Sequence, residues 1–140
     1  MLATVAGQAG ADDTGGYVPY SGIVRGTEGV TPVELVIENA GPGPILCQAS
    51  LAHWYSDDLG EAPAAGVLSV TLWHDPETGS LVLLNAHRDR MPVEAVTCRA
   101  PDATRWTRLA LPFAAGEGPA RIVRRCATGA DAALVCGPVD

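Results

Sequence analysis

The sequence predicts an all-β domain whose antiparallel strands form two packed sheets. Short apolar runs rich in β-branched residues recur at short intervals, and 16 glycines and 11 prolines punctuate the chain. Short strands separated by turn residues are typical of sandwiches and barrels. No stretch shows helical periodicity with capping residues, and no internal repeat is visible. At 140 residues the chain is long enough to form one domain with its own core.

The cysteine spacing favours an immunoglobulin-like sandwich of about seven or eight strands. Cys47 lies in an early strand and Cys98 follows about fifty residues later, as in the disulfide that joins the two sheets of that architecture. Tryptophans lie between the two cysteines, but Val96 occupies the position where such domains carry a tyrosine. The pattern therefore indicates an architecture and not a family.

Strands are expected, in chain order, at 33–39, 45–56, 67–74, 80–85, 91–98, 105–113, 121–126 and 132–136. Residues 57–66, with the sequence DDLGEAPAAG, are expected to form a loop. Alternation within 45–56 places these residues on the core face: Ile45, Cys47, Ala49, Leu51, His53 and Tyr55.

The segment SVTLWHDPETGSLVLLN, residues 69–85, is expected to form a hairpin. Pro76 suits the first corner of a type I turn, and Gly79 supplies the positive φ that closes it. A loop of Pro76 to Gly79 pairs Asp75 with Ser80, His74 with Leu81, and Leu72 with Leu83.

Both faces of this hairpin are apolar. One face carries Val70, Leu72, Leu81 and Leu83, and the other carries Thr71, Trp73, Val82 and Leu84. A sheet with one wet face shows clean alternation instead. The second face is therefore covered by another part of the chain, or it is an exposed patch that meets a partner. Trp73, Val82 and Leu84 are the candidate partner-binding residues.

The first 16 residues are expected to be a flexible N-terminus or the remnant of a signal peptide, followed by a single β-sandwich domain over 17–140. Ala9-Gly10-Ala11 before two aspartates resembles a signal-peptidase site, although no basic residue precedes it. The segment GQAGADDTGG offers little apolar surface to bury.

The four cysteines indicate export to the periplasm or the extracellular space. Their number is even, and none lies in a C-x-x-C pair or at zinc-finger spacing from a histidine. The expected disulfides are Cys47–Cys98 and Cys126–Cys136. The alternative is four buried free thiols in a cytosolic domain.

The charge balance argues against nucleic acid as a partner. The formal net charge is −7, and all nine basic residues are arginines. No run approaches the roughly 18 apolar residues of a membrane span, so membrane insertion is not expected.

No catalytic constellation is visible. There is no G-x-S-x-G motif and no Gly-rich phosphate loop. Asp57 and Asp58 are adjacent, and adjacent residues of a strand point to opposite faces. His53, His74 and His87 are weak candidates for a copper or zinc site, since their spacing matches no compact motif.

These observations predict an exported, non-enzymatic β-sandwich that binds another protein or acts as an accessory subunit of an envelope or secreted assembly. No cofactor is expected. The alternative is a small periplasmic domain that binds copper or zinc through the three histidines.

Overall fold

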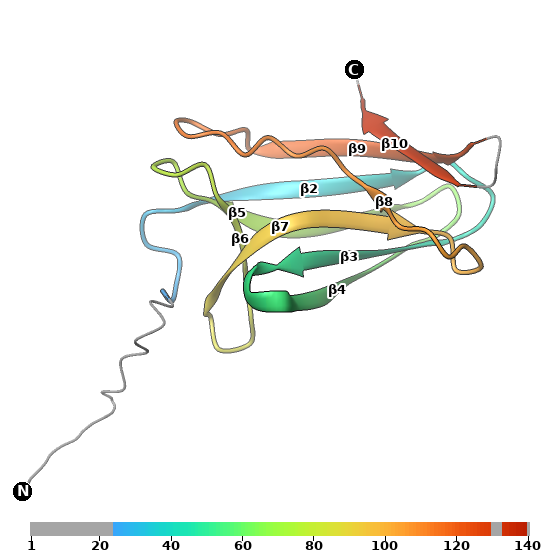
Figure 1. Cartoon of the computed structure of the whole chain (residues 1–140). Coiled ribbons are helices and arrows are strands. Elements are labelled where there is room, and N and C mark those ends of the chain that lie inside the picture. The colour runs from blue at the N-terminus through green and yellow to red at the C-terminus, as the bar shows by residue number, and fades with distance from the viewer. Residues whose placement is uncertain (1–23, 130–132, 140) are drawn as a thin grey trace, which may run out of the picture.

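The described part of the chain is all-β, and its nine strands form one mixed sheet (Figure 1). The computed structural model describes residues 24–129 and 133–139. The strands are β2 (Thr31–Asn39), β3 (Ile45–Leu51), β4 (Tyr55–Ala62), β5 (Val67–His74), β6 (Leu81–Leu84), β7 (Arg90–Arg99), β8 (Thr107–Arg108), β9 (Arg121–Thr128) and β10 (Leu134–Pro138). The helical structure of the described residues is one 3-10 turn, η1 (Ala52–Trp54), and no helix among them is long and apolar enough to cross a membrane.

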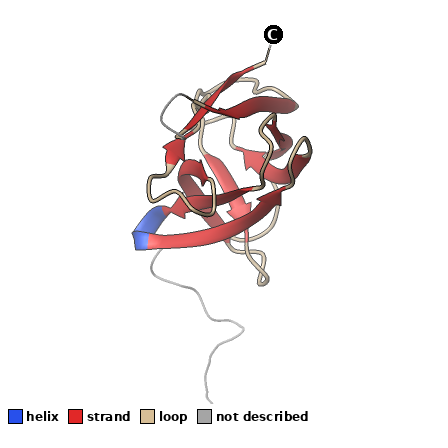
Figure 2. Ribbon diagram, turned by 90° about the vertical axis from the view of Figure 1, so that its right-hand side faces the viewer, coloured by secondary structure: helices blue, strands red, loops and turns tan. Residues whose placement is uncertain are grey.

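The strand order is β10-β9-β2-β5-β6-β7-β3-β4, with β8 beside β7. β7 belongs to both halves of the sheet. One half contains β10, β9, β2, β5 and β6, and the other contains β3, β4 and β8. Its beginning pairs with β6, where Pro92 lies opposite Val82, and from Val93 onward it pairs with β3. The sheet therefore turns at β7 and curls around a common interior, as the end view shows (Figure 2).

The core lies between the two halves. The largest fully buried side chains come from both: Leu35, Ile37, Ile45, Leu72, Leu81, His74, Val33, Val96, Cys47, Cys98 and Cys126. In β3 the alternation is clean, with every second residue from Ile45 to Leu51 buried. Strict period-two burial of this kind is what a strand with one core face requires.

The structure confirms the all-β prediction but does not support an immunoglobulin-like two-sheet sandwich specifically. The ladders between described strands are antiparallel except for one, in which β2 and β9 run parallel from Glu34↔Arg121 to Asn39↔Cys126. The strands also form a continuous path rather than two separate sheets.

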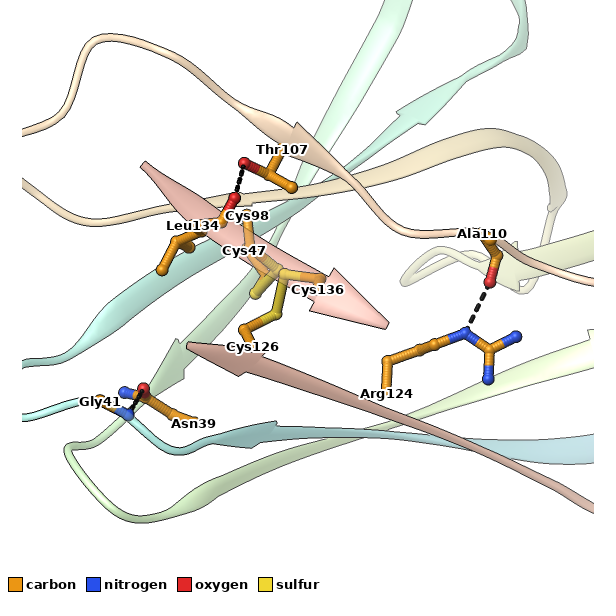
Figure 3. Close-up of a disulfide and its surroundings, with 10 residues drawn as sticks. All are labelled: Asn39, Gly41, Cys47, Cys98, Thr107, Ala110, Arg124, Cys126, Leu134 and Cys136. Carbon is orange, nitrogen blue, oxygen red and sulfur yellow. Dashed lines mark hydrogen bonds between the residues drawn. A yellow bond between two sulfur atoms is a disulfide. The ribbon is translucent and has the colours of Figure 1, made fainter. Parts of the chain in front are cut away.

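Both predicted disulfides are present, and no described cysteine is free (Figure 3). The expectation that Cys47–Cys98 joins two sheets is wrong. The two residues lie directly opposite each other on the neighbouring strands β3 and β7, with their Cα atoms 4.1 Å apart. Cys126 and Cys136 are likewise opposed on β9 and β10. Each disulfide therefore fixes the register of one antiparallel pair.

Asn39, at the end of β2, forms hydrogen bonds with both chain connections that cross between the halves at one end of the molecule. Its side chain is 2 % exposed, and its amide nitrogen donates to the carbonyls of Gly43, Ala62 and Pro63. Its side-chain oxygen accepts the N–H of Gly41 at 2.9 Å (Figure 3). One buried side-chain amide thus forms hydrogen bonds with backbone groups of both the β2–β3 and the β4–β5 connections. Left buried without a partner, these backbone groups would cost desolvation energy.

The prediction of a loop at 57–66 is wrong, because β4 occupies Tyr55–Ala62. The strand expected at 45–56 ends at Leu51 instead, and η1 separates it from β4. β4 is the last strand of the order, and most of its residues are exposed on both faces, so its sequence carries no alternation. A register shift of the β3–β4 ladder also leaves Leu59 without an opposite residue.

The strand expected at 105–113 is also largely wrong, because only Thr107–Arg108 pairs as β8. Residues 109–120, here called the strap, have no regular structure and lead to β9. The strap lies over the end of the β5–β6 hairpin: Gly116 N–H donates to Pro76 O at 2.7 Å, and His74 Nε2 lies 2.9 Å from Ala114 O.

The hairpin itself forms with the expected turn. His74 pairs with Leu81, Asp75 N–H donates to Ser80 O, and Gly79 has a φ of +82°. The ladder ends after Trp73↔Val82, so the expected Leu72–Leu83 pair is not formed.

The remaining strands lie within a few residues of their expected positions. The flexible N-terminus or signal remnant expected at residues 1–16 lies outside the described residues.

Candidate functional site

The most unusual backbone of the described chain lies in η1. His53 and Trp54 have φ angles of +67° and +71°, in the left-handed region that side chains other than glycine rarely adopt. Each such residue costs on the order of 1–3 kcal/mol. Trp54 is nevertheless 98 % exposed, and the next residue, Tyr55, is 61 % exposed. The turn therefore holds the Trp54 side chain in solvent at an energetic cost, and Tyr55 follows it with ordinary extended backbone.

An apolar pocket of about 290 Å³, here called the Val82 pocket, lies beside this turn. Its lining comes from the 24–30 segment, the η1 turn, the β5–β6 turn, β6 and the start of β7. The lining residues are Val24, Val30, His53, Tyr55, Asp75, Thr78, Ser80, Val82, Arg90, Met91 and Pro92. Most of the lining surface is apolar although five lining residues are polar or charged, and such a mixture is typical of a site that receives an apolar group and orients it through polar contacts.

Two arginines hold the 24–30 segment in place as one wall of the pocket. Arg90 donates to the carbonyls of Gly26 and Glu28, the first at 2.7 Å. Arg25 forms an ion pair with Asp89 at 3.0 Å and donates to the His87 carbonyl at 2.7 Å. This wall therefore depends on polar contacts with β7 and the β6–β7 connection as well as on apolar packing.

The three residues predicted to bind a partner do share the outer face of the hairpin. Val82 is 5 % exposed and belongs to the lining of the pocket, whereas Trp73 and Leu84 are half-buried. Cross-strand pairing aligns Pro32, Trp73, Val82 and Pro92 in one row across β2, β5, β6 and β7. Val24 and Val30 of the 24–30 segment line the pocket together with Val82, whereas Pro32 and Pro92 at the two ends of the row are exposed.

The structure does not bring the three candidate metal ligands together. His53 lines the Val82 pocket and His87 lies in the exposed β6–β7 connection, whereas His74 is buried beneath the strap. Across residues 24–129 and 133–139, no group of three or more metal-binding side chains is close enough to hold an ion.

The two adjacent aspartates point to opposite sides of β4, as expected. Asp57 lies opposite Ala49, on the core side of β3, and Asp58 lies opposite Gln48, on the outer side. Two carboxylates that diverge in this way cannot share a proton or flank a bond.

Sequence reasoning missed the η1 turn because it continued the alternation of β3 through His53 and Tyr55. The available signal was chemical: these two successive positions on the supposed core face carry polar groups, and a run of acidic residues follows. A core strand rarely continues in that way.

In comparisons with known proteins, no family model, curated protein or solved structure matches the chain.

Proposed function

We propose that this chain is an exported, non-enzymatic domain that binds another protein through the η1 turn and the Val82 pocket. The observation that carries the proposal is Trp54, which is 98 % exposed although its backbone is strained. Strained backbone persists where the surrounding structure enforces it, and it is concentrated at binding and catalytic sites. An exposed tryptophan held in this way is an anchor for a partner surface.

The chemistry around Trp54 suits a protein partner. Tryptophan and tyrosine dominate the energetics of protein interfaces, because they bury a large area and lose little conformational entropy. The pocket beside Tyr55 has room for one apolar side chain of a partner. The partly open row of Pro32 and Trp73 extends the apolar surface across the same sheet.

Export is supported by the two disulfides, which pair all four cysteines. Disulfides persist in the periplasm and outside the cell and are rare in the reducing cytosol. A domain stabilised in this way suits an accessory or adaptor role in an envelope or secreted assembly.

The test is a capture experiment from the exported fraction of the source cells, followed by reconstitution with the purified partner. Trp54→Ala is expected to weaken binding by about 2 kcal/mol or more, as at a hot spot, because the partner loses its anchor. Its stability should change little, since the side chain is exposed in the free protein.

Phe113→Ala is the matched control, because Phe113 is also an exposed aromatic residue but lies on the strap. Equal binding by the wild type and both variants would refute the proposal.

A further inference from the structure

The β4 edge adjoins the proposed binding site. β4 is the final strand of the order β10-β9-β2-β5-β6-β7-β3-β4, so in the described part of the chain only one of its sides pairs, with β3. Its first residue, Tyr55, also lines the Val82 pocket. An open strand edge and an apolar pocket are therefore continuous with each other.

We propose that β4 accepts an extended, lysine- or arginine-rich segment of the partner as an additional strand, with an apolar side chain of that segment in the Val82 pocket. The proposal rests on the proposed protein-binding function and names the chemistry of the partner. Strand addition supplies affinity through main-chain hydrogen bonds, and side-chain pockets supply specificity.

The charge of β4 selects this occupant. Asp57, Asp58 and Glu61 are exposed along the strand. The ion pairs formed among the described residues join Arg25 with Asp89, Arg121 with Glu34 and Arg125 with Glu38, and none involves β4. Three carboxylates without an internal counter-charge attract basic side chains on a strand placed beside them.

The same charges disfavour other occupants. Charged residues on an edge strand are a common protection against unspecific pairing, because like charges on an added strand repel. A second copy of this chain would bring its own acidic β4 edge against the first. Repulsion of wrong partners and attraction of the right one then come from the same residues.

The first test uses a fluorescein-labelled peptide in which lysine alternates with valine and leucine stands at the carboxyl end. This end lies beside Tyr55 when the peptide adds antiparallel to β4. Matched peptides carry glutamate in place of lysine, or glycine in place of leucine. We expect the lysine–leucine peptide to bind at least about tenfold more tightly than either, with an affinity that falls as salt is added.

Hydrogen exchange then locates the contact. Amides within Tyr55–Ala62 should become protected when the peptide binds. A peptide N-methylated at the residues that face β4 should bind at least about tenfold more weakly, because it lacks the main-chain donors. Two peptides are needed, each N-methylated at one of the two alternating sets of residues, because only one set directs its N–H groups toward β4. If both peptides bind with unchanged affinity, strand addition is wrong.

The protein variant is Asp57→Asn/Asp58→Asn/Glu61→Gln, which removes the charges and preserves the shapes. It should lose the preference for lysine over glutamate, whereas Glu94→Gln/Asp102→Asn/Glu117→Gln, which neutralises exposed carboxylates outside β4 and the Val82 pocket, should retain it. A preference that survives in the β4 variant would overturn the proposal.

The two proposals fail separately. If Trp54→Ala weakens capture of the natural partner but neither lysine nor β4 charge affects peptide binding, the protein-binding function stands and strand addition is wrong. If lysine peptides bind β4 while Trp54→Ala leaves capture of the natural partner unchanged, the acidic edge binds basic strands but the proposed anchor is wrong.

Discussion

His74 shows how a residue that resembles a ligand can instead serve the fold. It is 1 % exposed, and its Nε2 lies 2.9 Å from the Ala114 carbonyl. A carbonyl only accepts, so Nε2 is the donor of this hydrogen bond. Among the residues that the structure describes, none is a hydrogen-bond partner of Nδ1, and Gly118 covers this atom so closely that a Cβ there would lie 2.7 Å away.

Gly118→Ala should therefore destabilise the protein, because the added methyl group collides with a ring that its bond to Ala114 prevents from moving. Overpacking of this kind costs about 1–3 kcal/mol. Urea unfolding measures the change. Gly43→Ala is the control, since nothing lies within 4 Å of its Cβ position. Equal unfolding midpoints in urea for the two variants would show that the strap can shift to accommodate the added methyl group.

Trp73→Ala tests what covers the outer face of the hairpin. The side chain is half-buried within the chain, so its removal should cost about 2 kcal/mol, less than the 3–5 kcal/mol of a fully buried aromatic residue. Thermal unfolding measures the loss of stability. Trp54→Ala is the control, because Trp54 is exposed and removal of its side chain should leave the stability nearly unchanged. A neutral Trp73→Ala would mean that a partner, and not the chain, completes this face.

At the scale of elements, the strap depends on His74 for its position over the hairpin. His74→Ala removes the hydrogen bond to Ala114 and leaves a cavity beneath residues 109–120. Hydrogen exchange should then rise in the strap and remain unchanged in β3, because the disulfide and the core hold that strand. A uniform rise over the whole chain would show that His74 supports the core as a unit instead.

The elements that the sequence predicted well are those with one buried face. β5 has its expected limits, and the Asp75–Ser80 turn forms as Pro76 and Gly79 indicate. Period-two burial and turn chemistry are local properties, so the sequence records them directly.

The elements that the sequence missed depend on contacts distant in the chain. β4 is a strand because it pairs with β3 at the edge, not because it has an apolar face, and LALPF (109–113) is part of the strap although it is apolar enough for a strand. The exposed Trp54 was missed for a different reason, since the alternation of β3 was continued beyond Leu51, where the strand ends. Of the candidate partner-binding residues, only Val82 lines the pocket.

At the scale of the whole molecule, the two disulfides should contribute unequally to stability. Cys47–Cys98 closes a separation of 51 residues and Cys126–Cys136 one of 10. In the chain-entropy model these loops correspond to about 4 and about 3 kcal/mol. Paired Cys→Ser variants, compared by chemical unfolding, should follow that order. Thiol titration of the denatured, unreduced protein should find no free thiol, and four reactive thiols in protein from an oxidising compartment would contradict the pairing.

The parallel β2–β9 ladder also determines how the protein resists mechanical force. The two strands are paired from Glu34↔Arg121 to Asn39↔Cys126, and the second disulfide prevents β10 from peeling away beyond that point. Tension between the two ends of the described chain therefore pulls β2 from its amino end and β9 from its carboxyl end. The hydrogen bonds between parallel strands loaded from opposite ends break together in shear, and the rate of forced unfolding is governed by that barrier. If the described chain is held at both ends, load consequently passes through this ladder and through the 24–30 segment that forms one wall of the Val82 pocket, whereas the η1 turn lies outside that path.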